Sequence, residues 1–202
     1  MRALVLRLMC FAHCLMAGDR LVDIQTVIPD IVVDCRYATT KNVVGKPIYP
    51  ISNCYLLQSV AFKLAQVQRS LKAQGYGLLV WDAYRPLSAQ KLLWESATAF
   101  QKKFFANPSM GGRHTRGTTV DVTLISVHDG SLIEMGTDHD DFTEKAAFDC
   151  SSISPKAKEH RTILREAMCA HGFSPLEHEW WHFDIKEWRT YPVLSVELND
   201  LT

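Results

Sequence analysis

The stretch His178-Glu179-Trp180-Trp181-His182-Phe183-Asp184-Ile185, near the C-terminus, decides between two folds. Its first five residues match the pattern H-E-x-x-H, in which one face of a helix carries two metal-binding histidines. The surrounding residues disfavour a helix, because Pro175 lies just before the stretch and two tryptophans occupy its centre. The residues after His182 continue with the alternation that is typical of a strand. We therefore predict a final core strand over residues 180–185.

The strand interpretation changes which residues could bind a metal. A helical H-E-x-x-H site needs a further ligand downstream, and no such motif occurs in residues 183–202. We predict that His182 is a ligand carried by the strand, and that Glu179 lies at the strand entrance and faces a water on the metal. His178 is then incidental. The helical metallopeptidase site remains the competing interpretation.

A second segment, His114 to Asp121, supplies two more candidate ligands. Residues 118–124 alternate, with Val120, Val122 and Leu124 on one side and Asp121 on the other. Taken singly, His114 would be an exposed loop histidine and Asp121 a hydrogen-bonding residue at a strand end. Together with residues 179–182 they match a catalytic zinc site, which has three protein ligands, an open position for water and a base.

The chain resembles the D-alanyl-D-alanine dipeptidases of the VanX type. The resemblance rests on Trp81–Pro86, His114–Asp121 and Glu179–His182. Two further blocks are similar to the family and occur in the same order: Asp34–Thr39 with Asn42 and Gly45, and Met135–Thr137 with Asp140. The similarity runs roughly from residue 30 to residue 185, which is most of the predicted domain.

This resemblance implies an α+β fold, shared with other cell-wall DD-peptidases and the hedgehog signalling domain. The expected fold is a single compact domain with a small, mostly antiparallel central sheet flanked by helices. The resemblance also implies one Zn²⁺ per chain, bound by His114, Asp121 and His182. Glu179 would be the general base and acid, and Arg85 would stabilise the oxyanion that forms during hydrolysis.

The resemblance extends to the substrate pocket, with two departures. Tyr37 and Asp140 match positions that line the pocket, and Asp140 suits a free ammonium group. Gly112-Arg113 stands where relatives often carry serines, and His139 stands where the family has phenylalanine. Both departures lie where they could alter the pocket, so strict dipeptide specificity is less firmly implied than zinc-dependent hydrolysis.

We therefore expect a zinc metallopeptidase that hydrolyses D-alanyl-D-alanine to D-alanine in peptidoglycan metabolism. One alternative is a zinc DD-carboxypeptidase or endopeptidase that acts on larger peptidoglycan peptides. Another is a non-catalytic, zinc-binding interaction module. The presence of both Glu179 and Arg85 argues against the module, because structural zinc sites are closed and need neither.

The remaining pattern mixes helices and strands without regular β-α-β alternation, which predicts an α+β class. We expect strands near residues 31–33 and over residues 78–81, and a loop over residues 106–117. We also expect three helices. The first has apolar positions from Leu56 to Leu71 and stops at Gly75, the second is capped by Ser88 and reaches Phe100, and the third starts at Pro155 and stops near Gly172.

Composition fits one ordinary globular domain, predicted over residues 18–202. Acidic and basic residues balance at 22 each among 202 residues, which gives no electrostatic case for nucleic acid or an anionic membrane. The hydrophobic fraction is 47% and the mean hydropathy is −0.06. The predicted partner is the small dipeptide substrate, and no obligate protein partner is evident.

Residues 1–17 differ from the rest and are predicted to be a signal peptide. Positive charge precedes an apolar run from Leu8 to Ala17, which is too short to span a bilayer. Export to the periplasm is expected; the alternative is an N-terminal helix or strand of a cytoplasmic protein. Four cysteines remain after residue 17, which allow two disulfides or four buried thiols: Cys35, Cys54, Cys150 and Cys169.

Overall fold

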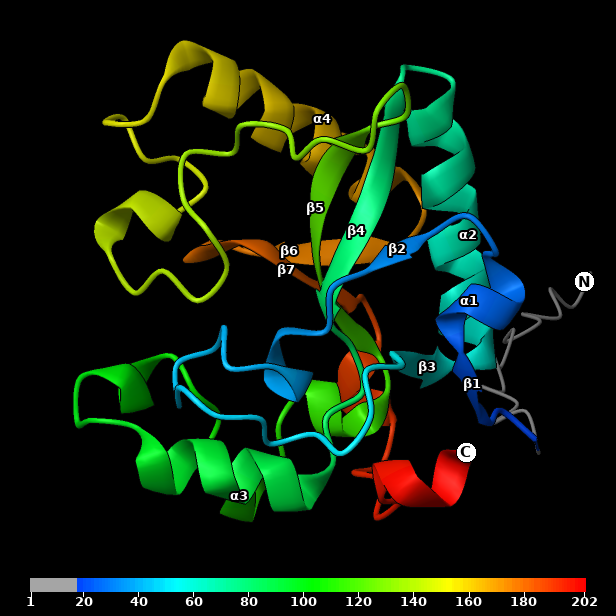
Figure 1. The fold of residues 1–202 in the computed structure, drawn as a ribbon, viewed down its shortest axis with the longest axis vertical. Helices are drawn as coiled ribbons and strands as arrows, with labels where there is room; N and C mark the ends of the chain where they lie inside the picture. The colour runs from blue at the N-terminus through cyan, green and yellow to red at the C-terminus, as the bar shows by residue number, and fades with distance from the viewer. Residues whose placement is uncertain (1–17) are drawn as a thin grey trace, which may run out of the picture.

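The computed structural model describes residues 18–202, and the predicted signal peptide lies outside the described residues. Its centre is a five-stranded sheet with the order β2-β4-β5-β7-β6 (Figure 1). The first strand pair is parallel and the other three pairs are antiparallel. The strands of this sheet are β2 (Val32–Val33), β4 (Tyr76–Asp82), β5 (Thr119–Ser126), β6 (Phe173–Leu176) and β7 (Glu179–Ile185).

Two long helices cover one face of this sheet. Helix α2 (Gln58–Lys72) contacts β4, helix α4 (Pro155–Ala170) contacts β5 and β6, and the two helices contact each other. Helix α3 (Leu87–Ser96) lies apart from them, in the lower half of Figure 1. The predicted α+β class, with a mostly antiparallel sheet and flanking helices, is confirmed.

Smaller elements complete the domain. Strands β1 (Leu21–Asp23) and β3 (Tyr55–Leu57) form a separate antiparallel pair, and the short helix α1 (Ile24–Val27) follows β1. Single 3₁₀ turns occupy many connections: η1 (Arg36–Ala38), η2 (Gln101–Lys103), η3 (Pro108–Met110), η4 (His114–Arg116), η5 (Glu144–Ala146), η6 (Trp188–Thr190) and η7 (Leu198–Leu201).

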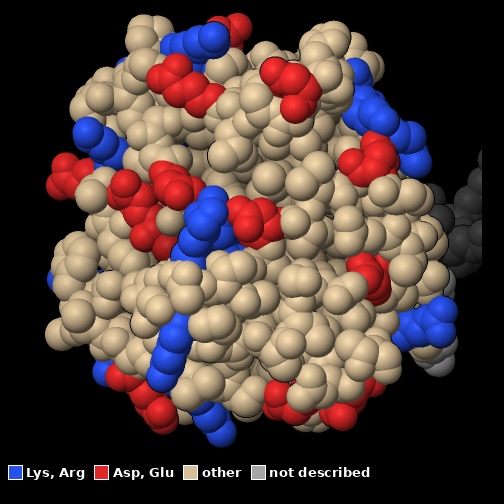
Figure 2. Space-filling view, in the orientation of Figure 1, with Lys and Arg blue, Asp and Glu red and all other residues tan. Residues whose placement is uncertain are grey.

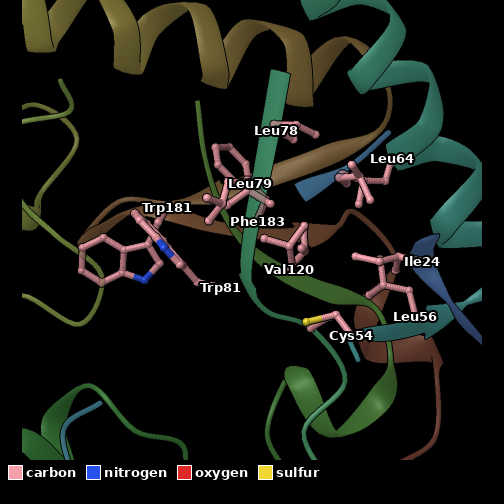
Figure 3. Close-up of a cluster of buried hydrophobic side chains, with 14 of the residues drawn as sticks. Ile24, Cys54, Leu56, Leu64, Leu78, Leu79, Trp81, Val120, Trp181 and Phe183 are labelled. Atoms are coloured by element: carbon pink, nitrogen blue, oxygen red, sulfur yellow. The ribbon is translucent and has the colours of Figure 1, made fainter. Parts of the chain in front are cut away.

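The core is continuous from the sheet to the β1–β3 pair. Figure 3 shows Val120 and Phe183 beside β4, with Ile24 and Leu56 at the far end of the same cluster. Alternation along β5 places Val120, Val122 and Leu124 in this core with no exposed surface. Asp121 points to the opposite face and is also buried, so that the polar side of β5 is covered by protein.

Three helix boundaries predicted from the sequence were wrong. Leu56 and Leu57 lie in β3 rather than in the helix, because they pair with Val22 and Leu21. Ser88 does not cap α3: Pro86 is the capping residue and makes no side-chain capping bond, while the Ser88 hydroxyl donates to Glu197. The same helix ends at Ser96, before Phe100.

The other predicted elements are confirmed, including α4, which starts at Pro155 after the capping residue Ser154. On the face shown in Figure 2, acidic and basic side chains are interspersed among uncharged ones. Over residues 18–202, no helix has the length and apolarity needed to cross a membrane. No disulfide joins the four cysteines of these residues, and Cys35 and Cys54 are buried thiols.

Candidate metal centre and active site

Three buried side chains from different segments converge on one point. They are His114 in turn η4, Asp121 on β5 and His182 on β7, none of them more than 6% exposed. The His114 Nε2 atom lies 3.4 Å from both Asp121 Oδ1 and His182 Nδ1, and the last two atoms are 3.1 Å apart. The structure thus brings together the three residues that the sequence predicted as ligands.

These three atoms fit a zinc ion. Ligands at about 2.0–2.1 Å from tetrahedral zinc lie about 3.3–3.4 Å from one another, close to the observed separations. Asp121 Oδ1 is buried and has no hydrogen-bond partner among the described residues. An unpaired buried carboxylate oxygen is costly unless a cation or a donor satisfies it, and the donor set of two imidazoles and one carboxylate is typical of catalytic zinc sites.

The pairing of the strands positions two of the ligands. Asp121 and His182 are directly paired residues of the antiparallel strands β5 and β7. On the other side of β5, a bulge in β4 shifts the register so that Asp82 comes opposite Asp121. Bulges re-aim side chains beside active sites, and this one aligns Asp82, Asp121 and His182 across three neighbouring strands.

The third ligand comes from the turn before β5. The left-handed conformation of Gly117 (φ +67°) ends this turn, and a Cβ atom there would meet Leu21 and Leu57 at 2.9 and 3.2 Å. The chain therefore needs glycine to pass from His114 into β5. The His114 Nδ1 atom donates to the Ala83 carbonyl at 2.8 Å, which leaves Nε2 to face the other ligands.

Acidic neighbours orient the other histidine and the aspartate. His182 Nε2 lies 3.1 Å from Asp184 Oδ1, and Asp184 also accepts from Thr119 and Arg113. Such a carboxylate–histidine contact fixes the ring and leaves Nδ1 for a metal. Although burial raises the pKa of Asp121, the charge and hydrogen bonds of the nearby histidines hold it well below its usual range, so this carboxylate is ionised.

Glu179 stands at the start of β7, beside the three ligands. Its Oε2 atom lies 3.6 Å from His182 Nδ1, and its side chain is 14% exposed. Burial raises the pKa of Glu179 to about 7. A carboxylate with this pKa can both accept and return a proton near neutral pH, as a general base and acid must.

Arg85 is fixed by several contacts at the edge of the site. Its guanidinium donates twice to Asp82 Oδ2, at 2.7 and 3.0 Å, and once to Gln90 at 3.0 Å. The same group stacks over the ring of Tyr37 at 4.8 Å. Although burial alone would lower it, the pKa of Arg85 is raised by its acidic surroundings, so the group stays positively charged beside the ligands.

A cavity of about 1020 Å³ opens in front of these groups. His114, Asp121, His182, Glu179 and Arg85 all line it. Aromatic and apolar side chains form another part of its lining, namely Phe100, Phe104, Phe105, Phe142 and Leu176, and polar residues such as Lys103, Glu144 and His178 line it as well. The site is therefore accessible to a substrate while its charged groups remain largely buried.

Of the two predicted pocket residues, Asp140 lines this cavity and Tyr37 does not. Asp140 is the one described non-glycine residue with positive φ (+55°), a conformation that is costly and tends to occur at functional sites. Tyr37 is fully buried behind it and donates its hydroxyl to Asp140 Oδ2 at 2.8 Å. Tyr37 therefore contacts Asp140 from inside the protein, and of the two residues only Asp140 is placed in the cavity lining.

The helical H-E-x-x-H interpretation is wrong for this chain. His178 is exposed in the turn between β6 and β7 and is not part of the ligand cluster. Of the two departures from the family pattern, Gly112-Arg113 lines the cavity and His139 does not; Arg113 also forms an ion pair with Asp184.

Sequence reasoning missed the residues that support the ligands, Asp82 and Asp184. Asp184 carried a usable signal, since it stands two residues after His182 on a predicted strand and so shares its side. Asp82 lies within the motif Trp81–Pro86, but no local pattern indicates a role for it. Its contacts with Arg85 and Tyr49 depend on the bulge and on a buried tyrosine far away in the chain.

An open site with three ligands and a carboxylate base beside it is typical of metal-dependent hydrolases, and the geometry places the protein in that class. A family model described as D-ala-D-ala dipeptidase, of the peptidase M15 group, matches residues 17–194. The chain therefore belongs to this metallopeptidase family.

Two relatives that are similar in sequence agree with this assignment. The D-alanyl-D-alanine dipeptidase of Escherichia coli (strain K12) is 33% identical over 179 residues, which cover 89% of this chain and 91% of that protein. The D-alanyl-D-alanine dipeptidase of Enterococcus faecalis is 33% identical over 173 residues, with 75% and 84% covered. Among solved structures, the vancomycin resistance D,D-pentapeptidase VanY is 14% identical with a TM-score of 0.42, over 70% of this chain and 78% of that one.

Proposed function

We propose that this protein is a zinc-dependent dipeptidase that hydrolyses D-alanyl-D-alanine to D-alanine in peptidoglycan metabolism. One Zn²⁺ per chain would be held by His114, Asp121 and His182. The observation that carries the proposal is the convergence of these three ligand atoms beside Glu179, in a chain of the D-Ala-D-Ala dipeptidase family.

Each side chain around the ligands has a separate role in the proposed reaction. Bound zinc would supply Lewis acidity, which polarises a carbonyl and activates water. Glu179 takes a proton from the attacking water and passes it to the nitrogen that leaves when the C–N bond breaks. The fixed charge of Arg85 stabilises the negative charge that develops on the carbonyl oxygen. Asp140 accepts the free ammonium group of the dipeptide.

One observation favours a second candidate, a DD-carboxypeptidase or endopeptidase acting on larger peptidoglycan peptides. The cavity of about 1020 Å³ is at the upper end of the usual range for pockets that bind drug-sized ligands, roughly 300–1,000 Å³, and a two-residue substrate leaves much of it unfilled. The placement of Asp140 in the lining favours the dipeptide, because a carboxylate there pairs with an ammonium group that an acylated peptide lacks.

Release of free D-alanine separates these candidates. We expect the protein to cleave D-Ala-D-Ala in preference to a peptidoglycan pentapeptide that ends in D-Ala-D-Ala, and to lose this activity in the presence of a zinc chelator. Faster release from the pentapeptide would favour the carboxypeptidase. Zinc binding without release from either substrate would favour the interaction module.

We also propose that the protein is exported to the periplasm and that residues 1–17 are removed during export. Support comes from the positive charge followed by a short apolar run in this segment. Intact-mass measurement of protein recovered from its native compartment tests the proposal. A cytoplasmic product that retains Met1 to Ala17 would contradict it.

A further inference from the structure

His139 is a buried histidine to which the proposed reaction assigns no role. It lies in the loop between β5 and α4, and its side chain is 2% exposed. Its ring stacks on Trp81 with 5.2 Å between centroids and meets the edges of Trp181 and Tyr37 at 5.7 and 6.1 Å. Packing on three aromatic rings fixes the plane of the imidazole and the direction in which its nitrogen atoms point.

One of these nitrogen atoms faces the proposed metal centre. His139 Nε2 lies 3.1 Å from Asp121 Oδ2 and 3.6 Å from Asp140 Oδ1. Ionised carboxylates only accept hydrogen bonds, so Nε2 carries a hydrogen and donates it to Asp121. This holds for the neutral ring with its hydrogen on Nε2 and for the protonated ring alike, so the contact does not depend on the charge of His139.

The two oxygen atoms of Asp121 therefore have different surroundings. Oδ1 faces His114 and His182 and has no hydrogen-bond partner among residues 18–202, whereas Oδ2 is occupied by His139. A carboxylate can bind a metal through one oxygen or through both. An unrestrained Oδ2 could turn toward the ion and fill the position that the substrate and water need.

We propose that His139 is a positioning residue, which holds Asp121 so that only Oδ1 is offered to zinc. The inference rests on the proposed zinc centre. The hydrogen bond fixes the orientation of the ligand and keeps the fourth position open. The phenylalanine expected here from the family resemblance could pack on Trp81 but could not donate this bond, so the contact is a property of this chain.

Zinc affinity of the full-length protein, measured by competition with a chromophoric chelator, tests the proposal. We expect His139→Phe to bind zinc about 10- to 100-fold more weakly than the wild type, the usual effect of losing a hydrogen bond to a metal ligand. The matched control is His178→Phe, which changes an exposed histidine outside the cluster and should bind zinc as the wild type does.

A second pair of variants separates the hydrogen bond from the packing. Gln and Met have side chains of similar length, but only Gln carries an N–H that can reach Asp121. His139→Gln should therefore bind zinc more tightly than His139→Met, and this comparison stays valid if the Phe variant folds poorly. Thermal unfolding of the metal-free variants reports folding independently of the metal.

Cobalt substitution gives a readout that does not depend on activity, because the visible absorption of Co²⁺ falls as its coordination number rises. The Co²⁺ forms of the wild type and His139→Gln should absorb more strongly than that of His139→Met. Equal zinc affinity and equal Co²⁺ spectra in the Gln and Met variants would overturn the inference and leave the metal centre intact. A wild type that binds no zinc would contradict the metal centre itself.

Discussion

At the scale of single residues, each proposed ligand side chain has two polar atoms. One faces the metal position, and the other contacts a polar group of the protein. His114 is held by the Ala83 carbonyl, His182 by Asp184 and Asp121 by His139. The ligands therefore have little freedom to rotate, and the site is organised before any metal binds. Single substitutions around it can then separate chemistry from metal binding.

Glu179 provides the clearest such separation. Glu179→Gln keeps the shape of the side chain but removes its ability to take up a proton. We expect the variant to bind zinc in the wild-type amount and to lose turnover of D-Ala-D-Ala by about 100-fold or more, the scale of a lost acid–base group. Metal analysis and kcat on the same preparation check this. Loss of zinc from the variant would instead make Glu179 a ligand.

Asp140 determines the predicted preference for a free ammonium group. Asp140→Asn should raise the KM for D-Ala-D-Ala by about 30-fold, since removing one member of a buried charge pair costs roughly 2 kcal/mol or more. The control is Asp138→Asn, which alters a more exposed aspartate paired with Arg36.

The same charge pair can be tested by removing the ammonium charge from the substrate instead of the carboxylate from the protein. N-acetyl-D-Ala-D-Ala lacks the ammonium charge, so the wild-type protein should cleave it poorly. Steady-state kinetics with both substrates give the comparison. Efficient cleavage of the acetylated dipeptide would contradict the role of Asp140 and favour the carboxypeptidase.

The sequence was enough to predict that three candidate ligands come together, but not what surrounds them. Spacing and the family resemblance pointed to His114, Asp121 and His182, and the structure places these side chains close together. The contacts that orient them join residues far apart in the chain, such as His139 and Asp121 or Tyr37 and Asp140. Such partners depend on how the loop after β5 packs, which no local pattern encodes.

At the scale of elements, helix α4 holds the loop that carries His139 and Asp140. Arg161 on this helix is 1% exposed and donates to three backbone carbonyls of the loop, those of Met135, Lys145 and Ala147. The helix thus fixes both ends of a segment that has little regular structure of its own. Arg161 therefore couples the stability of the helix to the geometry of the pocket, and His160 on the same helix adds a contact with the Glu134 carbonyl of this loop.

Replacing that side chain tests the coupling. Arg161→Ala leaves three carbonyls without their donor, and each unsatisfied group costs about 1–3 kcal/mol, so we expect a loss of about 3 kcal/mol or more in the free energy of unfolding. The KM for D-Ala-D-Ala should rise as well. Urea unfolding and kinetics measure the two effects, with the exposed Lys156→Ala on the same helix as the control. Unchanged stability would show that water replaces the arginine.

Helices and strands were predicted correctly where a single hydrophobic periodicity runs through the whole element. The prediction failed where residues of a strand also fit the periodicity of the helix that follows it. The alternation in β5 and the helical spacing in α4 gave the correct elements. Leu56 and Leu57 fit the helical spacing of α2, yet pairing with β1 makes them a strand. The pairing with β1 outweighs the helical preference of the local sequence, and this pairing is visible only in the structure.

At the scale of the whole molecule, the proposed site lies within one domain. The three candidate ligands and the residues that contact them directly lie between Asp82 and Asp184, on three neighbouring strands and in the loops beside them. The chain has no net charge at pH 7, and on the face shown in Figure 2 acidic and basic side chains are interspersed among uncharged ones. Recognition of a small substrate then depends on the few charged groups inside the cavity.

The central claim is that three residues form a single zinc centre on which hydrolysis depends. Stepwise addition of zinc to the metal-free protein, with D-alanine release from D-Ala-D-Ala followed at each step, tests it most directly. Activity should rise to a plateau at one zinc per chain in the wild type and in His178→Ala, and should stay absent in His114→Ala. Full activity in His114→Ala together with loss of activity in His178→Ala would contradict the account.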